Sequence, residues 1–148
     1  MATLSARANA VGPPLSPGVV RGSILIRQSV IAAVFSGISP VAAATLVACL
    51  NAGLHPQVQA IGSIGARYLC VMAQLGLALC GEGRIEYRGE LLDTSDVFAA
   101  AGMRPFIPDP KDGLALCRAA SVAIAQAVWT ACDAARVDAC ALTMEAFS

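Results

Sequence analysis

The chain has 148 residues, of which 57% are hydrophobic, 14% are charged and 5% are aromatic. This length suits one domain over residues 1–148, and the abundance of apolar residues excludes a disordered chain. The net charge is zero and the basic residues form no run or stripe, which excludes a nucleic-acid-binding surface.

Two Ser-Pro pairs predict the first two helices. Ser16-Pro17 places an N-cap serine before a proline at the first helical position, and the helix is expected to run to about Phe35. Ser39-Pro40 repeats this pattern, and the second helix is expected to run to Leu50, before the "NAG" stop at 51–53.

The uncharged stretch from Val30 to Leu50 is long enough to cross a bilayer. However, "SGISP" at 36–40 contains a glycine and a helix-starting proline, and no Trp, Tyr or Lys flanks the stretch. The pattern therefore predicts a buried helical hairpin and no membrane span.

The following residues alternate between turn signals and apolar runs. The predicted elements are an irregular loop over 54–65, a helix over 67–80 ending at "GEG", a hairpin in "RIEYRGEL" at 84–91, a short helix capped by Thr94 or Ser95 and ending at Gly102, and a proline-bearing loop over 103–108.

The last and longest helix is predicted to begin at Asp109-Pro110, with Asp112 three positions after the cap, and to run to about Ala146. Its polar residues form one narrow stripe, and the rest of its surface is mostly apolar; the stripe contains Arg118, Gln126, Trp129, Asp133 and Arg136. Such a helix is expected inside a bundle. The predicted fold class is therefore mainly α, a helical bundle with one small β-hairpin, whose excess apolar surface favours oligomerisation.

Six cysteines lie within apolar, helix-like segments, at positions 49, 70, 80, 117, 132 and 140. No Cys-x-x-Cys pair occurs and His55 is the only histidine, so the sequence predicts no metal site. Buried free thiols in a reducing cytoplasm are the better interpretation.

Several long segments resemble the histidine/phenylalanine ammonia-lyase and aminomutase family. They are "VVRGSILIRQSVIAAVFSGISPVAAATLVACLNAGLHP", "GSIGA", "LGLALCGEGRIEYRGELLDTSDVFAAAGMRPF" and "PKDGLAL". The resemblance runs from about Leu4 to residues 142–147, and it corresponds to an inner stretch, about a third, of a full-length family chain. It implies a fragment of the ammonia-lyase-like fold. It also implies assemblies in which several subunits build one site.

The resemblance further implies an electrophile made from the backbone of an Ala-Ser-Gly tripeptide, which cyclises and dehydrates to a methylidene-imidazolone. Here "GSIG" and Ala66 match the family, but one residue is missing, most simply the serine. Arg67 then stands at the glycine position and Tyr68 at the following aspartate. Without a serine to lose water the electrophile cannot form, and the arginine would obstruct ring closure. We therefore expect no such cofactor and no ammonia-lyase activity.

Two other family positions are altered as well. The family's active-site Asn, which follows "PKDGLAL" and one hydrophobic residue, falls on Arg118, and its Ser-His falls on Ala6-Arg7. The resemblance places a catalytic tyrosine before Met1 and further substrate-binding residues after Ser148.

Three interpretations remain open. The chain is a non-lyase, pseudoenzyme-like family member that acts through a homo-oligomer or a full-length homologue. Alternatively, Arg67, Tyr68, Arg118 and Arg7 form a repurposed acid–base pocket, of an isomerase or cyclase type, for an anionic metabolite. The third interpretation is a degenerate fragment without function.

Overall fold

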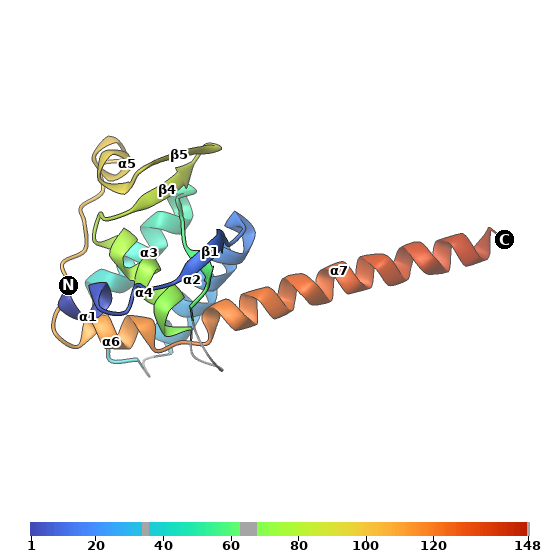
Figure 1. The fold of residues 1–148 in the computed structure, drawn as a ribbon, viewed down its shortest axis with the longest axis horizontal. Helices are drawn as coiled ribbons and strands as arrows, with labels where there is room; N and C mark the ends of the chain where they lie inside the picture. The colour runs from blue at the N-terminus through green and yellow to red at the C-terminus, as the bar shows by residue number, and fades with distance from the viewer. Residues whose placement is uncertain (34–35, 63–67, 148) are drawn as a thin grey trace.

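A computed structural model describes residues 1–33, 36–62 and 68–147 of the chain. The fold is mainly α, as the sequence predicts. Most helices gather in one body, from which the last helix projects (Figure 1). The helices are α1 (Ala2–Ser5), α2 (Pro17–Ala32), α3 (Pro40–Ala52), α4 (Leu69–Leu79), α5 (Thr94–Ala100), α6 (Asp112–Cys117) and α7 (Ser121–Ala146).

Both Ser-Pro pairs cap helices as predicted. The side chains of Ser16 and Ser39 each accept a hydrogen bond from the backbone amide three residues on, at 3.4 Å, and the following proline is the first helical residue. Gly53 ends α3 in the left-handed conformation, at φ 67°. Because α2 ends at Ala32 and α3 begins at Pro40, the uncharged stretch is divided between two helices that pack against each other.

Short strands form two small sheets rather than the single predicted hairpin. The hairpin itself is present, as β4 (Arg84–Tyr87) and β5 (Glu90–Asp93), and β2 (His55–Pro56) extends its sheet beside β4. A second sheet pairs β1 (Val11–Pro14) with β3 (Gln59–Ile61). The prediction of an irregular loop over 54–65 is therefore wrong for its described part, because strands of two or three residues are too short to show alternation in the sequence.

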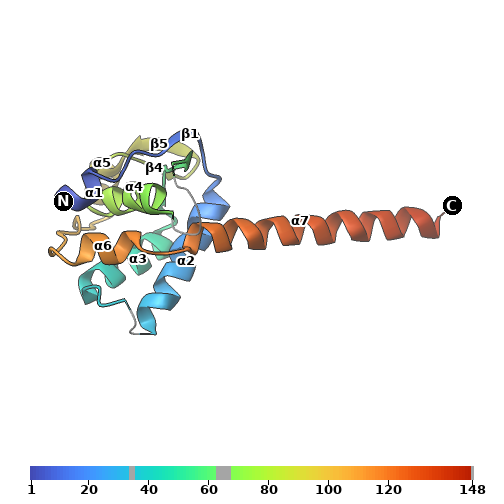
Figure 2. The same ribbon diagram turned by 60° about the horizontal axis from the view of Figure 1, so that its bottom comes forward.

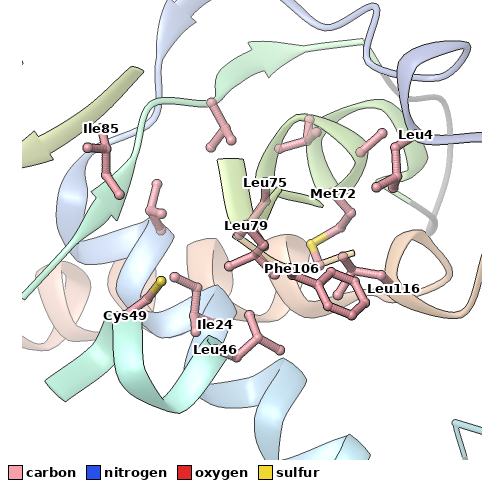
Figure 3. Close-up of a cluster of buried hydrophobic side chains, with 14 of the residues drawn as sticks. Leu4, Ile24, Leu46, Cys49, Met72, Leu75, Leu79, Ile85, Phe106 and Leu116 are labelled. Atoms are coloured by element: carbon pink, nitrogen blue, oxygen red, sulfur yellow. The ribbon is translucent and has the colours of Figure 1, made fainter. Parts of the chain in front are cut away.

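Helix α4 lies at the centre of the apolar core. Its buried residues meet apolar side chains from α1, α2, α3 and α6 and from the loop before α6, as Figure 3 shows for Leu4, Ile24, Leu46, Phe106 and Leu116. Gly76 of α4 leaves room for two of these side chains. A Cβ atom at this position would lie 2.8 Å from a methyl carbon of Leu4 and 2.9 Å from one of Leu116.

The predicted last helix is divided in two, and its predicted start is wrong. Residues 109–111 precede α6, and Arg118, at φ −82° and ψ 65°, leaves the helical region and ends it. Helix α6 packs against α4 and α1, whereas α7 packs against α2 (Figures 1 and 2). The chain therefore changes direction at residues 118–120, so that α6 can pack on α4 and α1 while α7 packs on α2. The cap of α5 also differs from the prediction, because Asp93 rather than Thr94 or Ser95 precedes that helix.

Helix α7 contacts the body only through its first turns, so the expectation of a helix inside a bundle is wrong for this chain alone. Ser121, Val122 and Ala125 are buried, whereas all residues of 127–147 are exposed. Trp129 is 43% exposed and lies against Gly18, where a Cβ atom would come within 2.6 Å of the indole ring. By length and composition alone, the stretch Asp112–Ala146 is also apolar enough to cross a membrane, and one such helix is weak evidence for a span.

The six cysteines, all of which lie within the described residues, form no disulfide and differ in exposure. Cys49 and Cys117 are buried, and burial raises the pKa of the Cys49 thiol to about 12. Cys132 and Cys140 are exposed on α7, so the prediction of buried thiols is wrong for these two.

Asp112 is a buried carboxylate that joins three segments. Its two oxygens accept hydrogen bonds from the backbone amides of Ser39, at 2.8 Å, and Asp109, at 3.1 Å, and its exposed fraction is zero. We expect Asp112→Ala to lower the free energy of unfolding by about 3 kcal/mol, because two amides lose a charged acceptor. Urea unfolding followed by circular dichroism measures this change.

Asp109→Ala is the matched control for that measurement. The Asp109 side chain is exposed and its backbone makes the contact, so this variant should stay within about 0.5 kcal/mol of the wild-type chain. Equal stabilities of the two variants would contradict the role of the Asp112 carboxylate.

Candidate functional site

The structure describes three of the site residues expected from the sequence. Arg7 follows α1 and is half-buried, Tyr68 precedes α4 and packs against the core, and Arg118 is exposed after α6. Ala66 and Arg67 lie outside the described residues. The convergence of Arg67 with the other three therefore stays a prediction.

Cys117 marks the place where cationic side chains approach from two directions. Burial raises the pKa of its thiol to about 11, the nearby guanidinium groups of Arg7 and Arg27 act in the opposite direction, and Cys70 adds to the rise. Arg7, from the loop after α1, and Arg27, from α2, therefore both lie near the end of α6. A thiol with this pKa stays protonated at neutral pH, so Cys117 is a poor nucleophile.

A pocket of about 570 Å³ opens between α2, the segment before α6, and α6 itself. Its charged lining residues are Arg27, Lys111 and Arg118, and no lining residue is acidic. The remaining lining comes from Val30, Ser36, Gly37, Pro110, Leu114 and Ala115. A concave site of this size with three cations and an apolar wall suits a small organic anion.

The structure therefore groups Arg118 with Arg27 and Lys111, whereas Arg7 and Tyr68 do not line this pocket. Neither Arg27 nor Lys111 is among the site residues expected from the sequence. A signal for Arg27 was present, because it falls on the same helical face as Val20 and Ile24, at spacings of seven and three residues. An arginine on an apolar helical face needs a specific partner once it is buried.

Helix α7 carries an exposed apolar stripe without charged residues. Eight exposed residues of this helix fall within an arc of about 100° when successive residues are placed 100° apart. We call this set the α7 stripe, and it consists of Ile124, Val128, Ala131, Cys132, Ala135, Ala139, Leu142 and Ala146. The charged residues of the helix lie outside this arc, and Arg136 pairs with Asp133 at 3.1 Å. The stripe remains uncovered because α7 extends beyond the body after its first turns, and every member of the stripe is exposed.

Within residues 1–33, 36–62 and 68–147, no three His, Cys, Asp or Glu side chains lie close enough together to hold a metal ion. His55 belongs to β2 and pairs with Glu86 of β4 through the backbone, as a packing residue of that sheet.

Comparison with known proteins identifies the family of this chain. A family model described as "Aromatic amino acid lyase" matches residues 1–148. Histidine ammonia-lyase of Gloeobacter violaceus is 38% identical over 149 residues, which cover 97% of this chain and 29% of that protein. Histidine ammonia-lyase of Geobacillus thermodenitrificans is 41% identical over 114 residues, which cover 76% of this chain and 23% of that protein.

Solved structures agree with these sequence matches. The ergothioneine-degrading enzyme ergothionase from Treponema denticola superimposes with a TM-score of 0.81 at 27% identity, over 84% of this chain and 25% of that one. Histidine ammonia-lyase from Trypanosoma cruzi gives a TM-score of 0.78 at 26% identity, over 83% and 24%. This chain thus spans less than a third of the length of each of these four proteins.

Proposed function

Because the chain belongs to the aromatic amino acid lyase family, we propose that it is a non-lyase member that acts through association of α7. The first support is chemical. The methylidene-imidazolone forms from an Ala-Ser-Gly tripeptide, and this chain reads Ala66-Arg67-Tyr68 at that place. No serine is present to lose water, so the residues do not fit the cofactor and the elimination has no electrophile.

The single observation that carries the association is the α7 stripe. Leu142 and Val128 are 67% and 54% exposed, and small side chains separate them along the stripe. Leaving such a continuous apolar surface in water is unfavourable, and burying it against another helix removes that cost. The run of small residues between Val128 and Leu142, at helical spacings, would let another helix approach closely.

We propose that the occupant of the stripe is α7 of a second copy of the chain. Ala135 lies near the middle of the stripe, and Asp133, Arg136 and Asp138 lie within three residues of it. At 100° per residue, Arg136 and Asp138 lie on opposite flanks of the stripe. In a parallel, in-register pair these flanks face each other, so each arginine would approach Asp138 of the other helix. The charge pattern therefore favours pairing with a second copy of α7 over pairing with an unrelated helix. We place this association in the cytoplasm.

A full-length homologue is the alternative partner, because it offers a related helix. The second candidate function, an acid–base enzyme for an anionic metabolite, is favoured by the cationic pocket beside Arg118. That function does not require association, so one experiment on α7 separates the two.

The test is light scattering after size-exclusion chromatography, over a hundredfold range of chain concentration. We expect a discrete oligomer for the wild-type chain and a dissociation constant at least about tenfold weaker for Leu142→Asp, because a carboxylate would be buried in an apolar interface. Val137→Asp is the matched control. Val137 is also 67% exposed on α7 but lies outside the stripe, so this variant should associate like the wild-type chain.

Thiol alkylation gives a second readout. Cys132 lies in the stripe, so it should react more slowly in the oligomer than in Leu142→Asp. A monomeric wild-type chain at every concentration would contradict the proposal, as would equal weakening by the two variants. Aggregation alone would favour the degenerate fragment.

A further inference from the structure

The pocket between α2 and α6 is lined by three cationic side chains and, among the described residues, by no carboxylate. Arg27 is 2% exposed, and within the described residues it forms no ion pair. Its one hydrogen bond goes to the backbone carbonyl of Ala115, and its Nε has no partner there. A neutral carbonyl satisfies one donor but does not compensate a buried charge.

Burial disfavours the charged form of this residue. Burial lowers the pKa of the Arg27 guanidinium below its usual value, and Cys117 acts in the opposite direction. An arginine remains charged at any physiological pH even so. The structure thus holds a desolvated cation beside an open pocket, where an anion would stabilise it.

The acidic residue next to Lys111 in the sequence is Asp112, and its carboxylate is bonded to the backbone outside the pocket. Asp112 follows Lys111, but both of its oxygens accept hydrogen bonds from the backbone amides of Ser39 and Asp109. Asp112 does not line the pocket. Lys111 and Arg118, which do line it, are exposed and form no ion pair within the described residues.

We propose that this pocket binds a small organic oxyanion, a carboxylate or a phosphate ester, between Arg27, Lys111 and Arg118. Arg118 supplies an exposed guanidinium fork, Lys111 adds a second exposed charge, and Arg27 provides a buried charge. Val30 and Leu114 form an apolar wall, so the ligand carries an apolar part beside its charged group. This site does not rest on association through α7.

Phenyl phosphate and benzoate are suitable probes, because they present the two oxyanion types on the same ring. Isothermal titration at constant ionic strength, with phenol as the neutral control, measures their binding. We expect one site per chain for at least one of the two anions and none for phenol. The tighter anion identifies the oxyanion type that the pocket prefers.

Arg118→Ala and Lys111→Ala test the location of the site, since both side chains are exposed and their removal should leave the fold intact. Each is expected to weaken binding at least about tenfold, the loss typical of one charge-assisted hydrogen bond. Arg104→Ala removes the same charge from an exposed position outside this pocket and should bind like the wild-type chain. Binding of neither anion at millimolar concentration overturns the proposal, and so does equal weakening in all three variants.

Discussion

The purified chain is expected to release no ammonia and no arylacrylate from histidine, phenylalanine or tyrosine. The reaction of the family needs an electrophile at the tripeptide, and Ala66-Arg67-Tyr68 contains no hydroxyl group on the residue after the alanine. An ultraviolet assay for the conjugated product measures this directly. Intact-mass spectrometry gives a second readout, because ring closure and serine dehydration would each remove one water from the chain.

A restored tripeptide provides the comparison. Inserting a serine after Ala66 together with Arg67→Gly recreates Ala-Ser-Gly, and this variant is the only one in which a mass loss is expected. Product or mass loss from the wild-type chain would overturn the non-lyase proposal, since it would require an electrophile from another source.

Replacing Gly76 by valine should destabilise the body more than any surface change. The new Cβ atom alone would lie 2.8 Å and 2.9 Å from methyl carbons of Leu4 and Leu116, which are fully or almost fully buried. Neither side chain can withdraw into solvent, so the packing of α1 and α6 on α4 must shift. Overpacking of this kind lowers the free energy of unfolding by about 3 kcal/mol. Urea unfolding followed by circular dichroism measures the loss.

Ala134→Val is the control for the loss of stability that comes from the low helix propensity of valine alone. Ala134 is exposed on α7, where a larger side chain meets no neighbour, so its variant should lose less than about 1 kcal/mol. A Gly76→Val chain as stable as this control would mean that the core around α4 is loose.

Local signals in the sequence were sufficient for α2, α3 and the β4–β5 hairpin, but not for the strands that pair over long distances in the chain. The Ser16 and Ser39 caps and the Gly53 stop act within three or four residues of chain, so their patterns predicted α2 and α3 closely. The pairing of β1 with β3 joins Val11 to Ile61, and nothing near either residue reveals the other. The division between α6 and α7 has the same origin, because "LCRAASV" contains no glycine or proline and the break follows from packing on two different helices.

The candidate site shows the same limit. Arg118 was identified because it replaces a family residue, but its neighbours in the pocket come from distant parts of the chain. Arg27 and the carbonyl of Ala115 are 88 residues apart in sequence. Only the tertiary fold brings them together, and only burial shows that Arg27 lacks a counter-charge among the described residues.

The exposed outer part of α7 has a consequence for how this segment becomes ordered. Residues 127–147 gain little tertiary stabilisation, so their helix is held mainly by its own main-chain hydrogen bonds. Such a helix exchanges with coil much more readily than one packed in a core. Amide hydrogens there should exchange with deuterium far faster than those of α4 when the chain is dilute, and slow down when it is concentrated. Ordering of the outer helix and recruitment of its partner would then be one coupled equilibrium.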